Sequence, residues 1–321
     1  MRIRLLVCLV GVVSLAGLLS AQGPVAGPQD NQTRGGQIDI NVLNVPLMVL
    51  VTDNKGKLIT NLTREDFRIY EDDKPQTIRN FARETDLPLS IALLVDSSGS
   101  VIEQIKFEQA AAIDFFFNTM KRRKDRGTVV GFDSVPRVLS NDTADGFTDE
   151  PERLADAVRK IKAGGGTAVF DAIYGSVKNL LSNESGERRK LVILISDGDD
   201  TASKRSKTEA LEMAQRHDAT IYAISTNKTS DTKSREKVRG DDVIKELVEE
   251  TGGKAYFPLK LDDLASDFQK IGEELRSQYV ISYAPTNQNL DGSYRRIRVE
   301  IPNKKYNART RQGYFASRGN Q

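Results

Sequence analysis

The stretch that decides the fold is Leu89–Val95 (LSIALLV), which runs directly into Asp96–Ser100 (DSSGS). The first part is almost continuously apolar, as in a strand that is buried on both faces of a parallel sheet. The second part has the pattern D-x-S-x-S and precedes a segment with helical periodicity. Ligands bind to open α/β sheets where strands end and helices begin, and one carboxylate with two hydroxyls suits a hard, oxygen-seeking cation. The stretch therefore predicts an α/β domain that binds a metal ion.

Strand-like and helix-like segments alternate around this stretch, from Leu87 to Ser277. The aliphatic run Leu191–Ile195 predicts a second strand that is buried on both faces. Val135–Leu139 follows the strand-like Thr128–Phe132 too closely for a parallel crossover, so we expect an antiparallel edge strand. The alternation predicts a doubly wound, mostly parallel six-stranded sheet. The remaining strands are expected at 220–224 and 255–257, and the helices at 101–122, 151–162, 168–181, 204–217, 241–251 and 262–276.

Both flanks of this α/β region, residues 37–86 and 278–321, are rich in strand-like segments. Because a segment as short as the N-terminal flank is marginal as an independent core, we expect the two flanks to pair into one small sheet. Asp53–Lys57 and Asp72–Pro75 are turn signals, and Asn289–Gly292 predicts a hairpin turn. Residues 38–42 alternate between apolar and polar side chains, as in a strand. Further strands are expected at 46–51, 279–283, 294–301 and 309–314.

Residues 1–21 have the layout of a secretory signal peptide, with Arg2 and Arg4 before the apolar run Leu5–Leu19 and small residues after it. The alternative is an N-terminal membrane anchor, although the run is short for a span of roughly 20 residues. We expect cleavage, followed by a flexible polar linker over residues 22–36. The mature protein would then have no membrane span and would reach the periplasm, the cell surface or the medium.

Charge and cysteine content exclude several classes of function. The only cysteine, Cys8, follows Val7 inside the apolar run, so lipid attachment is not predicted and the mature chain would have no disulfide. Loss of residues 1–21 removes two arginines and no acid, which changes 47 basic against 45 acidic residues to 45 against 45. A balanced chain gives no electrostatic reason to expect nucleic-acid binding.

Two further segments offer oxygen ligands at the ends of neighbouring elements. Gly164–Gly166 allow the backbone to approach closely just before Thr167, at the start of a predicted helix. Asp197 follows the buried run Leu191–Ile195 after one residue. In a parallel sheet these loops open at the same carboxyl edge. The sequence therefore predicts that five residues meet around one divalent cation: Asp96, Ser98, Ser100, Thr167 and Asp197.

This constellation resembles the von Willebrand factor type A (VWA) domain, whose metal-ion-dependent adhesion site (MIDAS) is written D-x-S-x-S, then Thr, then Asp. The resemblance implies that Ser98 and Ser100 bind the cation directly and that Thr167 is the ligand that moves. It further implies that Asp96 and Asp197 balance the charge partly through water, and that the sheet order is 3-2-1-4-5-6.

The flanks resemble an exported bacterial subgroup of this family called VWFA-related, so that the resemblance extends over residues 37–316. The residues that carry this second resemblance are Asp53, Gly56, Leu62, Asp66, Phe67, Tyr70, Glu71, Asp72, Tyr279, Tyr283, Pro285, Asp291, Gly292, Arg296, Gly313, Tyr314 and Phe315.

The chemistry of such a site favours binding over catalysis. Mg²⁺ prefers octahedral oxygen coordination and keeps several waters, and neutral hydroxyl ligands leave its charge largely uncancelled. We therefore expect Mg²⁺ (or Mn²⁺ or Ca²⁺) to take a Glu or Asp carboxylate from a partner protein, in adhesion or protein binding, without an enzymatic reaction. One alternative is a structural envelope scaffold in which the cation only stabilises the fold. Another is a Mg²⁺-dependent hydrolase, against which the missing general base argues.

Some of the residues that stand out also have ordinary structural interpretations. Ser100 and Glu103 fit a capping box at the start of a helix, a role that can coexist with metal binding. His217, the only histidine, lies at the end of the predicted helix 204–217, where a positive charge interacts favourably with the helix dipole. It has no visible link to Ser98, so a Ser-His-Asp triad is not predicted. The acids Asp133, Asp171, Asp199 and Asp200 are interpreted as turn or surface residues. The alternative for Asp171 is a hydrogen bond near the site, and for Asp199 and Asp200 it is contact with the cation through water.

Overall fold

The computed structural model describes residues 44–83, 87–99, 104–140, 143–184, 188–227, 235–260 and 263–316. All of them belong to one unit of the chain, Val42–Gln321. The predicted signal peptide, the linker, the alternating segment at 38–42 and the candidate ligand Ser100 lie outside the described residues. None of the helices in the described ranges is long and apolar enough to cross a membrane.

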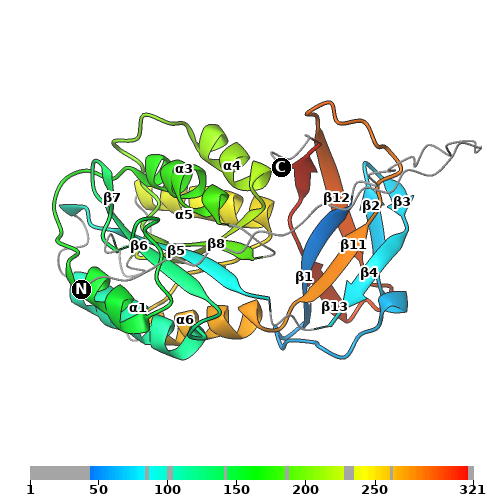
Figure 1. Ribbon diagram of the computed structural model, residues 1–321, viewed down its shortest axis with the longest axis horizontal. Helices are drawn as coiled ribbons and strands as arrows, with labels where there is room; N and C mark the ends of the chain where they lie inside the picture. Colours follow the sequence, from blue (N-terminus) through cyan, green and yellow to red (C-terminus); the bar gives the residue numbers. More distant parts are fainter. Residues whose placement is uncertain are drawn as a thin grey trace, which may run out of the picture. The chain divides into compact units, whose positions relative to one another are not determined.

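A six-stranded sheet lies at the centre of the α/β region (Figure 1). Its strands are β5 (Leu89–Asp96), β6 (Arg126–Phe132), β7 (Pro136–Val138), β8 (Arg189–Ser196), β9 (Ala219–Ser225) and β10 (Ala255–Tyr256). The order is β10-β9-β8-β5-β6-β7, and every neighbouring pair is parallel except β6 and β7. Counted along the chain this is the order 3-2-1-4-5-6, so the predicted topology and its antiparallel edge strand are confirmed.

The strands β5 and β8 occupy the middle of the sheet because their side chains are apolar on both faces. Every residue of β5 is buried. Its side chains alternate between two hydrophobic clusters: Ile91 and Leu93 belong to one, and Ala92 and Leu94 belong to the other. A fully buried aliphatic side chain contributes roughly 1.5–3 kcal/mol relative to an exposed one. These buried strands therefore fix the position of the carboxyl edge at which Asp96 lies.

Helices cover both faces of the sheet. One face is covered by α1 (Ile105–Thr119), α2 (Pro151–Arg159) and α6 (Asp263–Leu275), and the other by α3 (Val169–Asn179), α4 (Lys207–Arg216) and α5 (Arg235–Thr251). Figure 1 shows α1 and α6 on one side and α3, α4 and α5 on the other. The predicted helices are present with shifted ends. The largest shift is in α5, which begins at Arg235, six residues before the expected start. Its first turns contain few apolar residues, so the sequence shows little helical periodicity there.

In the described residues the flanks form strands that combine into two antiparallel sheets. The N-terminal flank supplies β1 (Val45–Asp53), β2 (Arg68–Glu71), β3 (Lys74–Gln76) and β4 (Ile78–Ala82), and the C-terminal flank supplies β11 (Tyr279–Tyr283), β12 (Tyr294–Glu300), β13 (Tyr306–Arg309) and β14 (Gly313–Phe315). The orders are β13-β1-β11-β4 and β14-β12-β2-β3. Each sheet thus contains strands from both flanks, which confirms the predicted pairing, but the prediction of one small sheet is wrong.

Two sheets form because each buries the apolar face of the other. Leu47 of β1 and Ile281 of β11 share one hydrophobic core with Ile69 of β2 and Ile297 of β12. A single sheet would leave this apolar face in water, whereas two packed sheets cover it from both sides.

Two local predictions in the C-terminal flank are also wrong. The expected strand at 309–314 is interrupted, and its two parts are the end of β13 and the start of β14, which lie in different sheets. Asn289–Gly292 is not a hairpin turn, because the strands on either side of it, β11 and β12, do not pair. The Gly292 N–H instead donates to the Ala316 carbonyl (2.7 Å). The segment connects β11 and β12, which belong to different sheets. By contrast, Asp72 and Asp73 (φ +46° and +61°) form the predicted turn between β2 and β3.

Candidate metal centre

Asp96 is the last residue of β5 and lies fully buried at the carboxyl edge of the central sheet. The Ser98 N–H donates to its Oδ1 (2.8 Å). The hydroxyl of Ser196, at the end of the neighbouring strand β8, donates to its Oδ2 (2.7 Å). Each carboxylate oxygen can accept a second partner. Asp96 is therefore held in one orientation and still has capacity for a cation or for water.

Thr167 reaches the same edge because its glycine loop is bonded to the turn that follows β5. The Gly164 N–H donates to the Ser97 carbonyl (2.6 Å), and the Gly99 N–H donates to the Gly165 carbonyl (3.2 Å). Gly165 has φ of +92°, a conformation that residues with a side chain rarely adopt. These bonds place Thr167, which is 6% exposed, beside the D-x-S-x-S turn.

The loop after β8 begins with Asp197 and is bonded to Thr167 as well. The Thr167 carbonyl accepts a hydrogen bond from the Thr201 N–H (2.9 Å). Gly198 has φ of +78°, and a Cβ there would lie 2.4 Å from the Gly240 carbonyl oxygen, so only glycine fits next to Asp197. The structure thus brings Asp96, Ser98, Thr167 and Asp197 to one edge of the sheet. Ser100, the remaining predicted ligand, is outside the described residues.

Acidic side chains lie close enough together here for their charges to act on one another. The pKa of Asp96 is raised to about 6, chiefly by burial and also by the negative charge of Asp197, against the opposing effect of its hydrogen bonds. The pKa of Glu108, in the first turn of α1, is raised to about 8 by burial and by the charges of Asp96 and Asp197. Glu108 is fully buried, and neither of its carboxylate oxygens has a hydrogen-bond partner among the described residues. Bound positive charge would relieve this repulsion.

Sequence reasoning missed Glu108, although the sequence carries a signal for it. Residues 108, 111, 112 and 115 recur at the spacing of one helix face. Ala111, Ala112 and Phe115 are all buried against the sheet. The same spacing applied to Glu108 would have placed an acid on the inward face of the helix that follows D-x-S-x-S.

A sequence model of the von Willebrand factor type A domain matches residues 90–274, more than half of the chain. The chain belongs to the von Willebrand factor type A domain family. The resemblance carried by D-x-S-x-S, Thr167 and Asp197 is thereby confirmed at the level of the family. VWA domains are generally protein-interaction modules that bind a divalent cation at the MIDAS.

Solved structures of other VWA proteins resemble this one at low sequence identity. A von Willebrand factor type A protein from Catenulispora acidiphila has 13% identity and a TM-score of 0.49, over 78% of this chain and 72% of that chain. Proximal thread matrix protein 1 from the mussel byssus has 14% identity and a TM-score of 0.50, over 64% of this chain and 51% of that chain. The same mussel protein with a zinc-occupied MIDAS motif has 17% identity and a TM-score of 0.46, over 62% of this chain and 48% of that chain. None of the curated proteins compared with the chain matches it.

The residues of this VWA domain fit a hard divalent cation. The side chains that meet at the carboxyl edge offer hydroxyl and carboxylate oxygens, the ligands that Mg²⁺ and Ca²⁺ prefer. No three Asp, Glu, His or Cys side chains within the described ranges lie close enough together to hold an ion on their own. The hydroxyls of Ser98 and Thr167 are therefore needed to complete a set of ligands. Glu108 adds a buried carboxylate that has no hydrogen-bond partner among the described residues.

The other acids near the site are turn, loop or surface residues. Asp133 accepts a hydrogen bond from the backbone N–H of residue 135 (3.0 Å), as expected of a turn residue. Asp171 accepts from the backbone N–H groups of residues 204 and 205 (3.0 and 2.9 Å). Asp200 accepts from the Phe170 N–H at the start of α3 (3.1 Å). Asp199 is exposed. Asp171 and Asp200 therefore hold the surrounding loops in place.

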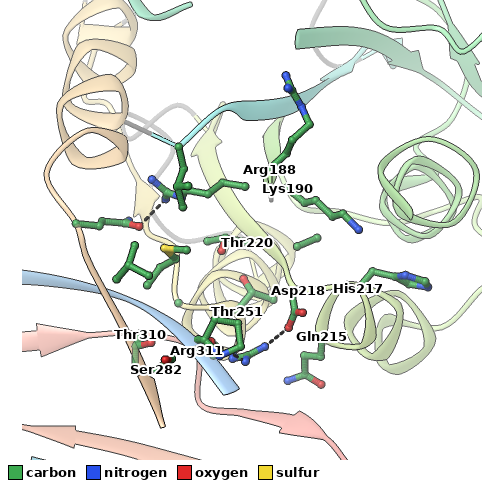
Figure 2. A pocket seen from close by; sticks show the side chains of 18 of the residues that line it. Arg188, Lys190, Gln215, His217, Asp218, Thr220, Thr251, Ser282, Thr310 and Arg311 are labelled. Carbon is green, nitrogen blue, oxygen red and sulfur yellow. Dashed lines mark hydrogen bonds and ion pairs between the residues drawn. The ribbon is translucent and has the colours of Figure 1, made fainter. Parts of the chain in front are cut away.

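His217 lies near the opposite, amino edge of the sheet, on the wall of a cavity (Figure 2). It is the C-cap of α4, the position that the sequence predicts. The cavity measures about 500 Å³, and its lining includes Lys190, Asp218 and Arg311, the last two joined as an ion pair in Figure 2. Burial and the charge of Lys190 lower the pKa of His217. Its place at the amino edge separates His217 from Ser98, which follows β5 at the carboxyl edge.

Proposed function

We propose that this chain is an exported module that captures an acidic residue of a partner protein through a bound divalent cation. The cation is Mg²⁺, with Mn²⁺ and Ca²⁺ as alternatives, and it would be held by Asp96, Ser98, Ser100, Thr167 and Asp197. The observation that carries the proposal is the bonding of the Thr167 loop to the turn after β5. These bonds keep oxygen donors from separate segments at one edge of the sheet.

Each residue has a role that follows from its position. Asp96 supplies a carboxylate that is held in one orientation, because it is buried and both of its oxygens accept hydrogen bonds. Ser98 and Ser100 offer neutral hydroxyls as direct ligands. Thr167 offers a third hydroxyl, and the family resemblance assigns it the movement that accompanies partner binding. A bound cation with so many neutral ligands supplies an open position with affinity for an outside carboxylate.

The proposal includes the division of the chain. Residues 1–21 would be removed as a signal peptide, 22–36 would form a linker, and 87–277 would be the VWA domain. Residues 37–86 and 278–321 would form one accompanying β module, which is supported by the two sheets that they share. A bacterial envelope or extracellular location is supported by the layout of the first 21 residues.

A capture experiment tests this function. The protein is immobilised and exposed to extract of its native envelope with Mg²⁺, with a chelator, and with a chelator followed by excess Mg²⁺. We expect wild-type protein to retain a partner only when Mg²⁺ is present, and Asp96→Asn to retain none under any condition. Asp114→Asn is the matched control, because Asp114 is an exposed acid on α1 and its loss should change nothing. Equal capture with and without the chelator would favour the scaffold alternative and contradict the proposal.

A further inference from the structure

Glu108 is a fully buried acid of this region that no part of the proposed function uses. Its side chain is 0% exposed, and neither carboxylate oxygen has a hydrogen-bond partner in the part of the chain that the structure describes. Buried carboxylates are ordinarily paired or hydrogen-bonded, because burial of an unpaired charge is very unfavourable. An orphaned carboxylate in an otherwise well-bonded domain therefore indicates that a partner is absent from the structure.

The surroundings of Glu108 show what kind of partner is absent. The charges that act on it are those of Asp96 and Asp197, and both are negative. The neighbouring positions on the same face of α1, Ala111, Ala112 and Phe115, are apolar and pack into the core. The two acids repel a charged Glu108, and its burial removes it from water. The missing group must therefore carry positive charge or donate hydrogen bonds.

We propose that Glu108 is a third carboxylate of the metal centre and accepts hydrogen bonds from water molecules that the cation binds. This inference rests on the proposed function, because it requires a cation at Asp96 and Asp197. Contact through water is proposed because no three acidic, histidine or cysteine side chains of the described segments gather closely enough to bind one ion directly. Mg²⁺ dehydrates reluctantly and keeps several waters, so a carboxylate that acts through water suits Mg²⁺ better than a cation that sheds its water.

The alternative is a neutral Glu108 that only fills space in the core. The two roles differ in how a charge-removing substitution acts with and without metal. Glu108→Gln keeps the shape of the side chain and removes the repulsion. If Glu108 serves the cation, this variant should be more heat-stable than wild type in a chelator and should gain less stability from Mg²⁺. If it only fills space, the substitution should change stability equally in both conditions.

The test combines Mg²⁺ titration by calorimetry with melting temperatures in a chelator and in saturating Mg²⁺, for full-length wild type, Glu108→Gln, Asp96→Asn and Asp114→Asn. We expect Glu108→Gln to weaken Mg²⁺ binding roughly 10-fold or more, as is usual for groups that bind a metal through another ligand. Asp114→Asn should behave like wild type, because it removes an exposed acid from the same helix. Glu108→Met, which keeps apolar volume, provides a second variant in case Glu108→Gln folds poorly.

The outcomes separate this inference from the function on which it rests. Wild-type affinity in Glu108→Gln and Glu108→Met, together with lost affinity in Asp96→Asn, would overturn the role of Glu108 and leave the metal centre intact. Absence of Mg²⁺ binding by wild type would overturn the proposed function together with the inference.

Discussion

Replacing Asp96 with asparagine should weaken Mg²⁺ binding roughly 100-fold or more, at the upper end of what the loss of a supporting carboxylate costs. Asparagine keeps the volume of the side chain and an acceptor for the Ser98 N–H, so the substitution removes mainly charge. The charge matters because Asp96 is fully buried and hydroxyl ligands bring none of their own. Calorimetric titration of Mg²⁺ into the full-length variant measures the loss, and circular dichroism checks that the fold is intact.

The control for this prediction is Asp199→Asn, which removes an exposed acid only two residues from Asp197. It should change the Mg²⁺ affinity little, because an exposed charge is screened by water and salt. Equal affinity of wild type and Asp96→Asn would show that the cation, if it binds, is held elsewhere.

The second large effect is expected in the β module, where Glu71→Ala should destabilise the fold by about 3–5 kcal/mol. Glu71 and Arg295 are 2% and 1% exposed, and they form an ion pair between β2 and β12 (3.4 Å). The Glu71 carboxylate also accepts hydrogen bonds from the hydroxyls of Tyr283 (2.7 Å) and Tyr314 (3.0 Å). Its removal would leave a buried guanidinium without its counter-charge and two buried hydroxyls without their acceptor.

Urea denaturation followed by circular dichroism measures this free-energy change. Asp156→Ala is a suitable control, because it breaks an ion pair with Arg159 in which both side chains are largely exposed. Pairs of that kind contribute little to stability, so the control should unfold close to wild type. If Glu71→Ala were no less stable than Asp156→Ala, the buried cluster would not be a main source of the module's stability.

The two parts of the fold differ in how far the sequence predicts them. Leu89–Val95 and Leu191–Ile195 are almost entirely aliphatic because both faces of their strands are buried. A short stretch of sequence is therefore enough to predict that they lie inside the sheet. The flanking strands are half-buried, and their alternation fits one sheet or two equally well. The partners that decide between these arrangements are distant in sequence, as in the pairing of Val45 with Tyr283 and of Glu71 with Ile297.

The candidate site was predictable where it depends on strand ends. Asp96 and Asp197 follow buried runs of neighbouring parallel strands, and Thr167 follows a glycine run at a helix start, so topology alone brings them to one edge. Glu108 was not predicted, because a glutamate within a helix is ordinarily exposed. Its inward position depends on the register of α1 against the sheet, which the spacing to Phe115 reveals once the helix is known to pack there.

The most direct test of the central claim is a crystal structure of the full-length protein grown with Mn²⁺, with diffraction data collected to record the anomalous signal of manganese. The account predicts an anomalous peak at the carboxyl edge of the central sheet, within direct coordination distance of the Ser98 and Ser100 hydroxyls and close to Asp96, Thr167 and Asp197. A map with no peak at that edge under saturating Mn²⁺, or with its only peak elsewhere, would contradict it.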